Sequence, residues 1–286
     1  MSQQPEIGRT LTNDVIASGA NARDERWREI YAKLVEHLHA FVRDVELTPN
    51  EWLEGIRFLT ATGQKCDDVR QEFILLSDTL GVSMLVDALA NRAASAGTAS
   101  TVLGPFFTTD AEEIPFGGSI SRPDDGIPMA VTGTVRAPDG TPITNAAIEV
   151  WEVDGAGQYD VQYADRVEPN GRGRVRTDAG GRFSFMANLP VSYSIPGDGP
   201  VGAMLASLGR HTMRPAHLHF SFTAPGFTPL TTALYVGDDP YIGGDAVFGV
   251  KPSLIGDYVR SGTGADATAS LHYDFVLVPE RTVARV

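Results

Sequence analysis

His217 and His219 lie two residues apart in a segment whose apolar and polar positions alternate. The apolar residues Leu218, Phe220 and Phe222 interleave with them, which predicts a half-buried β-strand with both imidazoles on one face. Two neutral imidazoles that converge on one point are a natural pair of metal ligands. The alternative is two core histidines hydrogen-bonded to the backbone, but burying two uncompensated rings on one face is costly. The spacing therefore favours a metal site.

The chain offers no carboxylate at the positions that would complete a familiar site around this pair. A two-histidine iron(II) site most often has Asp or Glu two residues after the first histidine, and that position is His219. A cupin-like site would need a Glu a few residues later, and residues 221–224 contain none. The one cysteine, Cys66, lies in a helical part of the sequence. Tyrosine is the donor type that remains.

Two tyrosines occupy segments that suit ligands. Tyr159 follows a turn sequence at 154–158, directly after a predicted strand, and Tyr193 lies between Pro190 and Pro196. A phenol has a pKa of about 10 and binds metal usefully only once it is deprotonated. A trivalent hard cation favours that deprotonation far more than zinc or iron(II) does. Tyr159 and Tyr193 with the two histidines therefore indicate iron(III), and the alternative is that both tyrosines are packing residues.

The elements that must position these residues change character near residue 100. Apolar residues at helical spacing predict a helix over 23–46. Thr48-Pro49-Asn50-Glu51 predicts the start of a second helix, and a third helical stretch covers 67–94 with a break at Gly81. Residues 97–127 look like a linker. Strands are predicted at 131–137, 147–153, 182–186, 217–223, 232–236 and 271–278. The fold class is therefore α+β, with an antiparallel sandwich or barrel after the helices.

Composition limits the possible partners. The formal charge of −13 and pI of about 4.8 argue against a nucleic-acid partner, which would favour a basic stripe. No apolar run approaches the length of a membrane span. A single cysteine fits a reducing compartment, so a cytoplasmic location is the expectation.

Four segments together resemble the intradiol ring-cleavage dioxygenases, the catechol 1,2-dioxygenase group. The segments are 104–107, Val150-Trp151 with Tyr159, 190–196 with Tyr193, and 209–220. The resemblance extends from the helical part to the last strand. Residues 70–87 and 245–254 look most like the hydroxyquinol-cleaving members of the group. Position 233 is Ala where catechol-specific relatives carry Gln, which weakens a plain catechol assignment.

The resemblance implies a helical N-terminal domain over 1–105, which dimerises around bound phospholipid in many members, and a β-sandwich catalytic domain over 106–286. It implies one non-haem iron(III) per chain, held by Tyr159, Tyr193, His217 and His219. Of the two tyrosines, Tyr193 would leave the metal when substrate binds, and Tyr159 would stay.

The implied reaction is cleavage of hydroxyquinol by dioxygen to 3-hydroxy-cis,cis-muconate, which tautomerises to maleylacetate. The alternative is a catechol or substituted-catechol 1,2-dioxygenase that forms cis,cis-muconates. Arg214, close to His217 in the chain, would stabilise negative charge on the substrate ring. Asp78 would bind the third hydroxyl, or else be a helix-capping or surface carboxylate. The substrate pocket would be lined by Leu75, Asp78, Val102, Leu103, Gly104, Pro105, Phe106, Ile195, Pro196 and Val247.

Two further expectations concern the surface and a different class of function. Arg172, Arg174 and Arg176 alternate along the chain, and we expect them to pair at a surface or interface, outside catalysis. A protein of another class, a metal-free sandwich that binds a ligand or carbohydrate, would share the strand pattern and would be colourless.

Overall fold

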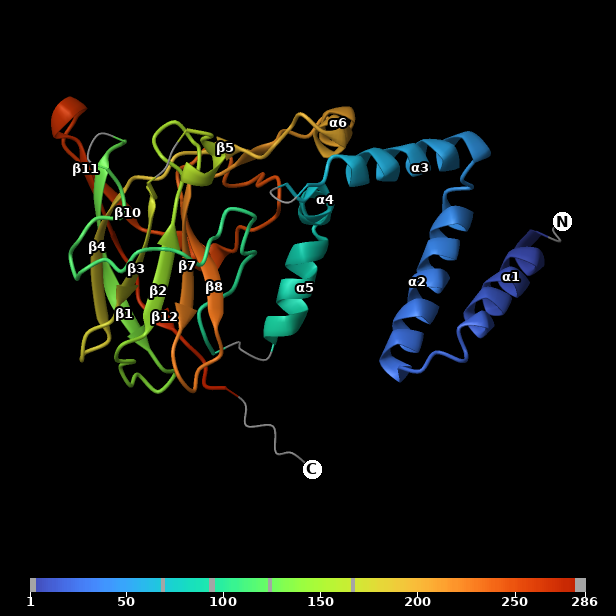
Figure 1. Cartoon of the computed structure of the whole chain (residues 1–286), viewed down its shortest axis with the longest axis horizontal. Coiled ribbons are helices and arrows are strands. Elements are labelled where there is room, and N and C mark those ends of the chain that lie inside the picture. The colour runs from blue at the N-terminus through green and yellow to red at the C-terminus, as the bar shows by residue number, and fades with distance from the viewer. Residues whose placement is uncertain (1–3, 68–69, 93–95, 123–124, 166–167, 281–286) are drawn as a thin grey trace. The chain divides into compact units, whose positions relative to one another are not determined.

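The chain divides into two compact units, Met1–Ala61 and Thr62–Val286. The computed structural model describes residues 4–67, 70–92, 96–122, 125–165 and 168–280 (Figure 1). The first unit holds the helices α1 (Gln4–Ser18) and α2 (Glu25–Asp44), and α3 (Pro49–Gln64) begins in it.

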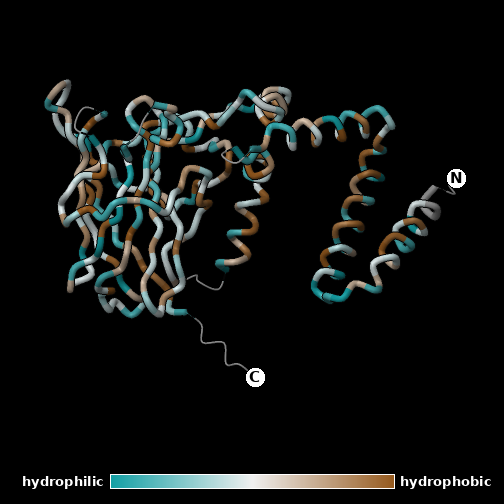
Figure 2. The backbone as a smooth tube through the Cα atoms, in the orientation of Figure 1, coloured by the Kyte–Doolittle hydropathy of each residue, from teal (hydrophilic) through white to brown (hydrophobic). Residues whose placement is uncertain are grey.

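Helix α1 was not predicted from the sequence, whereas α2 lies within the predicted range of 23–46 and α3 begins at the predicted Pro49. Asp24 caps α2, because its side chain accepts hydrogen bonds from the backbone N–H of Arg26 and Trp27 at 2.8 and 3.3 Å. The predicted capping box of α3 is confirmed: Thr48 N donates to Glu51 Oε2 at 2.9 Å, and Glu51 N donates to Thr48 Oγ1 at 3.4 Å. Hydrophobic residues recur along these helices (Figure 2). Many are exposed in the single chain, including Trp27, Leu34, Leu38, Phe41, Trp52, Ile56 and Leu59.

The third helical stretch forms two helices, α4 (Glu72–Thr79) and α5 (Val82–Asn91). Gly81 separates them with a positive φ of 74°, a conformation that glycine adopts without strain. Residues 68–69 and 93–95 of the predicted stretch lie outside the described residues. Within the described ranges, no single helix is long and apolar enough to cross a membrane; α4 and α5 pass such a test only as a pair, and they are bent by 74°.

Two sheets pack face to face in the second unit (Figure 1). One has the order β10-β11-β1-β12, with β4 also paired to β1; the other has the order β3-β2-β7-β8-β9; β5 and β6 form a small separate ladder. The strands are β1 (Pro128–Arg136), β2 (Ala147–Trp151), β3 (Arg172–Arg176), β4 (Arg182–Asn188), β5 (Tyr193–Ser194), β6 (Met213–Arg214), β7 (His217–Thr223), β8 (Leu230–Val236), β9 (Ile255–Gly256), β10 (Tyr258–Ser261), β11 (Thr268–His272) and β12 (Phe275–Val276). A helix, α6 (Pro200–Ser207), follows β5.

The α+β class is confirmed, and the pairing is mixed rather than wholly antiparallel. β1 runs parallel to β11 and β12, and β8 runs parallel to β9. The single strand predicted at 271–278 is wrong, since β11 and β12 are separate strands that meet different stretches of β1. The described part of the predicted linker packs on the sandwich: Thr98 N donates to Val276 O and Thr101 N to Thr231 O, each at 2.9 Å.

Alternation along β7 separates the core from the other face of its sheet. Leu218, Phe220 and Phe222 are fully buried between the sheets, where Phe220 and Phe222 contact Phe275. Burial of such side chains stabilises the fold by about 1.5–3 kcal/mol each. His217 and His219 consequently lie on the opposite face of the sheet.

Candidate metal centre

The two histidines of β7 face each other through their Nε2 atoms. The His217 Nε2 and His219 Nε2 atoms lie 3.0 Å apart, and both side chains are buried. His217 Nδ1 lies 2.6 Å from the carbonyl oxygen of Pro215, which can only accept a hydrogen bond. Nδ1 therefore carries the proton, and Nε2 of this neutral ring presents its lone pair.

The ring of His219 is held by a tryptophan but lacks a polar partner on one side. Trp151 stacks on it with centroids 4.7 Å apart and planes within 4°. Its buried Nδ1 has no hydrogen-bond partner. A proton on Nδ1 would leave two Nε2 lone pairs facing each other, and a proton on Nε2 would leave Nδ1 a bare buried acceptor. A cation bound to both Nε2 atoms resolves the first arrangement.

The environment keeps both imidazoles in the form that binds metal. Burial lowers the pKa of His217 and of His219 well below the ordinary value, and the positive charge of Arg214 lowers both further. Both rings are therefore neutral at physiological pH.

A tight turn after β2 presents Tyr159 to this pair. Asp154 Oδ1 accepts hydrogen bonds from Ala156 N and Gln158 N at 3.0 and 3.1 Å. Gly157 adopts a positive φ of 79°. A Cβ atom at this glycine would lie 3.4 Å from both Ser192 O and Tyr193 Cβ. The turn therefore lies next to the Tyr193 segment, and the positive φ, rather than crowding, favours glycine here.

A two-stranded ladder positions Tyr193. β5 pairs with β6 so that Tyr193 lies opposite Arg214. Asp239 joins this segment to the start of β7, because its Oδ2 accepts from Ser192 Oγ at 2.5 Å and from Ala216 N at 2.9 Å. One carboxylate therefore holds the segments of Tyr193 and His217 together.

The four predicted side chains meet in one cluster. The phenol oxygens of Tyr159 and Tyr193 lie 3.2 Å apart. The ring centroids are 5.5 Å apart for Tyr193 and His217, and 6.4 Å apart for Tyr159 and His219. Burial, with the neighbouring Tyr193, raises the pKa of Tyr159 well above the ordinary value, so Tyr159 ionises only with a strong compensating cation beside it.

This donor set fits iron(III). Two phenol oxygens and two neutral imidazoles are ligands that a hard trivalent ion can use, because its charge offsets the cost of deprotonating the phenols. Among the residues that the structure describes, no group of three His, Cys, Asp or Glu side chains could hold a metal. A metal in this part of the chain therefore depends on the tyrosines.

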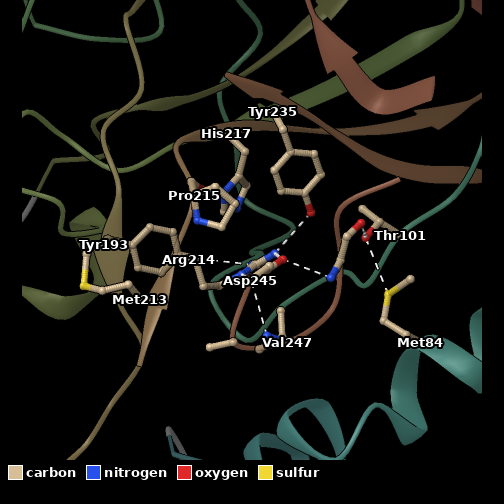
Figure 3. Close-up of polar contacts among 12 residues, drawn as sticks. Met84, Thr101, Tyr193, Met213, Arg214, Pro215, His217, Tyr235, Asp245 and Val247 are labelled. Atoms are coloured by element: carbon tan, nitrogen blue, oxygen red, sulfur yellow. Dashed lines mark hydrogen bonds and ion pairs between the residues drawn. The ribbon is translucent and has the colours of Figure 1, made fainter. Parts of the chain in front are cut away.

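Arg214 lies buried beside the cluster, in agreement with the expectation that its cation reaches the site. Nη1 donates to Tyr193 Oη at 3.2 Å, and Nη2 donates to Tyr235 Oη at 3.2 Å. Nε and Nη2 donate to the two carboxylate oxygens of Asp245 at 3.1 and 3.2 Å. Figure 3 shows the guanidinium among these three side chains. The bidentate pair orients the cation, and backbone N–H groups of Val247 and Gly249 hold Asp245 in turn.

Sequence reasoning did not identify Tyr235 or Asp245. Tyr235 lies directly opposite His217 in the β7–β8 register, as Ala233 lies opposite His219. Burial raises the pKa of Tyr235 to about 12, so its hydroxyl is protonated. Tyr235 lies two residues after Ala233 and therefore on the same face of its strand. This signal in the sequence becomes useful only once the pairing of β8 with β7 is known. For Asp245, between a glycine pair and an apolar stretch, the sequence offered no comparable signal.

The residues expected to bind substrate fall into three places. Asp78, Val102, Leu103, Gly104 and Pro105 line a pocket of about 630 Å³ beside α4 and α5. A Cβ atom on Gly104 would lie 4.0 Å from His219 Cε1, so this wall adjoins the cluster. Phe106 stacks on Tyr159 with centroids 4.5 Å apart. The apolar cluster around Leu205 contains Leu75, Ile195 and Val247; Pro196, next to Ile195, is partly buried.

Asp78 is a buried carboxylate on α4, so the surface alternative is wrong. Burial raises its pKa, while a hydrogen bond from Ser83 and the charge of Arg214 oppose the shift. Its side chain also lines the pocket described above. An acceptor at this place is available to a polar group of a bound molecule.

Tyr163, the neighbouring tyrosine, donates to Asp154 Oδ2 at 2.7 Å and so braces the turn before Tyr159. The surface role expected for Arg172 is wrong, since this side chain is buried against Asp160. Arg174 and Arg176 do pair at more exposed positions, with Glu149 and Glu113.

The chain matches known proteins over both of its parts. Residues 104–279 match the family model described as "Dioxygenase", and residues 24–98 match "Catechol dioxygenase N terminus". The intradiol ring-cleavage dioxygenase hqdA of Aspergillus niger is 47% identical over 96% of this chain and 86% of its own length. The hydroxyquinol 1,2-dioxygenase of Rhodococcus opacus is 47% identical over 98% of this chain and 96% of its own.

A solved structure agrees with the whole fold. The crystal structure of hydroxyquinol 1,2-dioxygenase from Pseudomonas putida DLL-E4 superposes with a TM-score of 0.91 at 45% identity, and the match covers 96% of this chain and 100% of that one. Sequence and fold agree over nearly the full length, and the Tyr/His cluster lies within the matched dioxygenase region. The chain belongs to the family of intradiol ring-cleavage dioxygenases.

Proposed function

We propose that Tyr159, Tyr193, His217 and His219 hold one non-haem iron(III) per chain. The observation that carries this proposal is the 3.0 Å approach of two buried, neutral Nε2 atoms next to two phenol oxygens that are themselves 3.2 Å apart. The family uses non-haem iron(III), which supports the identity of the metal.

The proposed substrate is hydroxyquinol, and the product is 3-hydroxy-cis,cis-muconate, which tautomerises to maleylacetate. The names of the similar proteins support this choice, since relatives 42–48% identical to this chain are called hydroxyquinol 1,2-dioxygenases. Ala233 is buried directly opposite His219, so the neighbouring strand presents a methyl group at this position. Catechol and substituted catechols are the alternative substrates.

The protein groups of the site have separate roles in this proposal. Iron(III), when bound, would hold both oxygens of the diol and make the ring reactive toward dioxygen. Tyr193 Oη accepts a proton from a substrate hydroxyl, and Arg214 Nη1, which donates to this oxygen, keeps it oriented. The fixed positive charge of Arg214 stabilises negative charge that develops on the substrate. Tyr159 stays in place, because Phe106 stacks on its ring.

The pocket residues complete the proposal. Asp78 accepts a hydrogen bond from the third hydroxyl of hydroxyquinol, and Val102, Leu103, Gly104 and Pro105 pack against the ring. Leu75, Ile195, Pro196, Val247 and Phe106 close the other sides. A buried acceptor matched to one hydroxyl discriminates against the analogue that lacks it.

The proposed chain comprises a helical domain over 1–105 and a catalytic domain over 106–286. Two such chains form a homodimer through their N-terminal helices, with phospholipid bound between apolar faces. The exposed Trp27, Leu34, Leu38 and Phe41 of α2 support this assembly. A single cysteine supports a cytoplasmic location.

Product analysis under labelled dioxygen tests the reaction directly. Purified enzyme is supplied with hydroxyquinol, catechol and 4-chlorocatechol, and the ring-opened acids are identified by mass spectrometry. Both atoms of one dioxygen molecule are expected in the acid from hydroxyquinol, with the highest kcat/KM for that substrate. A kcat/KM for catechol that equals or exceeds that for hydroxyquinol would overturn the substrate, and an extradiol product would overturn the reaction.

A further inference from the structure

Arg172 and Asp160 form a buried ion pair next to the cluster. Their side chains are 4% and 7% exposed. Arg172 Nε donates to Asp160 Oδ2 at 2.7 Å, and Nη2 donates to Oδ1, so the pair is bidentate. A buried pair of this kind is weak evidence for a stabilising role, because desolvation opposes the attraction. Its position suggests a more specific role.

The carboxylate of this pair organises the turn that follows Tyr159. Asp160 is the next residue in the chain and begins a short 3-10 helix, η2 (Asp160–Gln162). Its Oδ1 accepts from Val161 N at 2.8 Å, and its Oδ2 accepts from Asn170 N at 3.1 Å. The backbone on the C-terminal side of Tyr159 is therefore fixed to the ion pair.

The other edge of the guanidinium holds the segment that covers Tyr159. Arg172 Nη1 donates to Thr108 Oγ1 at 2.7 Å and to Phe106 O at 3.3 Å. The Phe106 ring stacks on the Tyr159 ring at 4.5 Å with 24° between the planes. One guanidinium thus binds the backbone of Phe106 directly and the turn of Tyr159 through the Asp160 carboxylate.

We propose that Arg172 is a positioning residue that sets the orientation of the Tyr159 phenol and of the 104–107 segment together. The inference rests on the proposed function, in which Tyr159 is an iron ligand and this segment contacts the substrate. Arginine suits this place because its rigid fork presents donors in two directions, whereas the ammonium of lysine cannot reproduce the bidentate pair and the Nη1 contacts at once.

The same strand offers a matched control. Arg174 is two residues further along β3 and points to the same side. It donates to Glu149 and to Thr109 O at 3.4 Å, so Arg174→Lys disturbs an ion pair and a backbone contact on this strand without touching the Tyr159 turn. Thr108→Val is a milder variant, since it removes one acceptor of Nη1 and leaves the buried charges paired.

The experiment compares the iron-loaded parent enzyme with Arg172→Lys, Thr108→Val and Arg174→Lys. Iron per chain, the visible phenolate-to-iron(III) band, the melting temperature, KM and kcat are measured. Arg172→Lys is expected to shift the band maximum and to raise KM roughly 5- to 10-fold, the size of effect that one or two lost hydrogen bonds produce. Thr108→Val should raise KM by a smaller factor, and Arg174→Lys should change neither band nor KM.

The results distinguish a failure of the positioning role of Arg172 from a failure of the proposed iron site. An unchanged band and KM in Arg172→Lys would overturn the inference, as would equal changes in Arg174→Lys, which would indicate a general loss of stability. If the parent enzyme has no iron and no band after reconstitution, the proposed function fails, and the inference fails with it.

Discussion

Arg214 Nη1 lies 3.2 Å from the phenol oxygen of Tyr193, so a buried cation and a proposed iron ligand share a hydrogen bond. The same guanidinium is paired with both oxygens of Asp245 and reaches the hydroxyl of Tyr235. The cation is therefore fixed before any substrate binds, and such preorganisation is what makes electrostatic stabilisation effective.

Arg214→Lys keeps the charge but cannot reproduce the three-way hydrogen bonding. We expect kcat to fall on the order of 10²- to 10³-fold, the range for removal of one preorganised donor, while iron content stays at that of the parent. Steady-state kinetics and elemental analysis measure both. Arg210→Lys is the control, because Arg210 donates to the backbone oxygens of Thr79 and Ala246. A kcat of Arg214→Lys equal to that of the parent enzyme would show that Arg214 has no catalytic role.

Tyr159→Phe removes one proposed phenolate ligand and its hydroxyl only. We expect the visible band of the iron-loaded protein to lose most of its intensity, since charge transfer from this phenolate is absent. Tyr273→Phe serves as the control, because this hydroxyl donates to the backbone oxygen of Ser253 rather than to the Tyr159 turn. Absorption spectra at equal iron content decide the matter, and a full band in Tyr159→Phe would assign the colour to another group.

His219→Ala deletes one of the two facing Nε2 atoms. We expect the protein to lose its iron, because the three remaining side-chain ligands bind the metal weakly when the fourth is missing. The control is His272→Ala, at an exposed position where the ring hydrogen-bonds Thr132. Stoichiometric iron in a folded His219→Ala protein would exclude this residue from the ligand set.

Asp78→Asn removes a charged acceptor from the pocket wall. We expect kcat/KM for hydroxyquinol to fall by about 10- to 100-fold, as for a lost hydrogen bond to a charged group, with little change for catechol. Asp87→Asn is the control, since Asp87 lines the same pocket but pairs with Lys251. Equal losses for both substrates would assign Asp78 a structural role.

Glu152 links stability to pH. Burial raises its pKa from 4.5 to about 8, against hydrogen bonds from Asn188 N and Ser121 Oγ. Between these values the unfolded chain releases a proton that the folded chain keeps, so stability falls as pH rises. One such group contributes a slope of about 1.4 kcal/mol per pH unit. Glu152→Gln cannot ionise and should flatten this slope in denaturant unfolding measured across the window. Parallel curves for the two proteins would contradict the assignment.

The sequence predicts the ligand strand well and its surroundings less well. Alternation gives β7 its observed bounds, because one face meets an aromatic core and the other holds His217 and His219. Tyr235 and Asp245 were missed, since their roles depend on strand register and on a loop that folds back to Arg214. The regular spacing of Arg172, Arg174 and Arg176 predicted a solvent-facing row, and only the tertiary position of Asp160 shows that the first of them is buried. Parallel pairing of β11 with β1 joins distant segments that no local pattern connects.

Metal analysis combined with electron paramagnetic resonance of the native protein tests the central claim most directly. We expect one iron per chain, a high-spin iron(III) signal and a red colour that changes when hydroxyquinol is added without dioxygen. Zinc in place of iron, or a reconstituted protein that stays colourless and binds no iron, would contradict this claim.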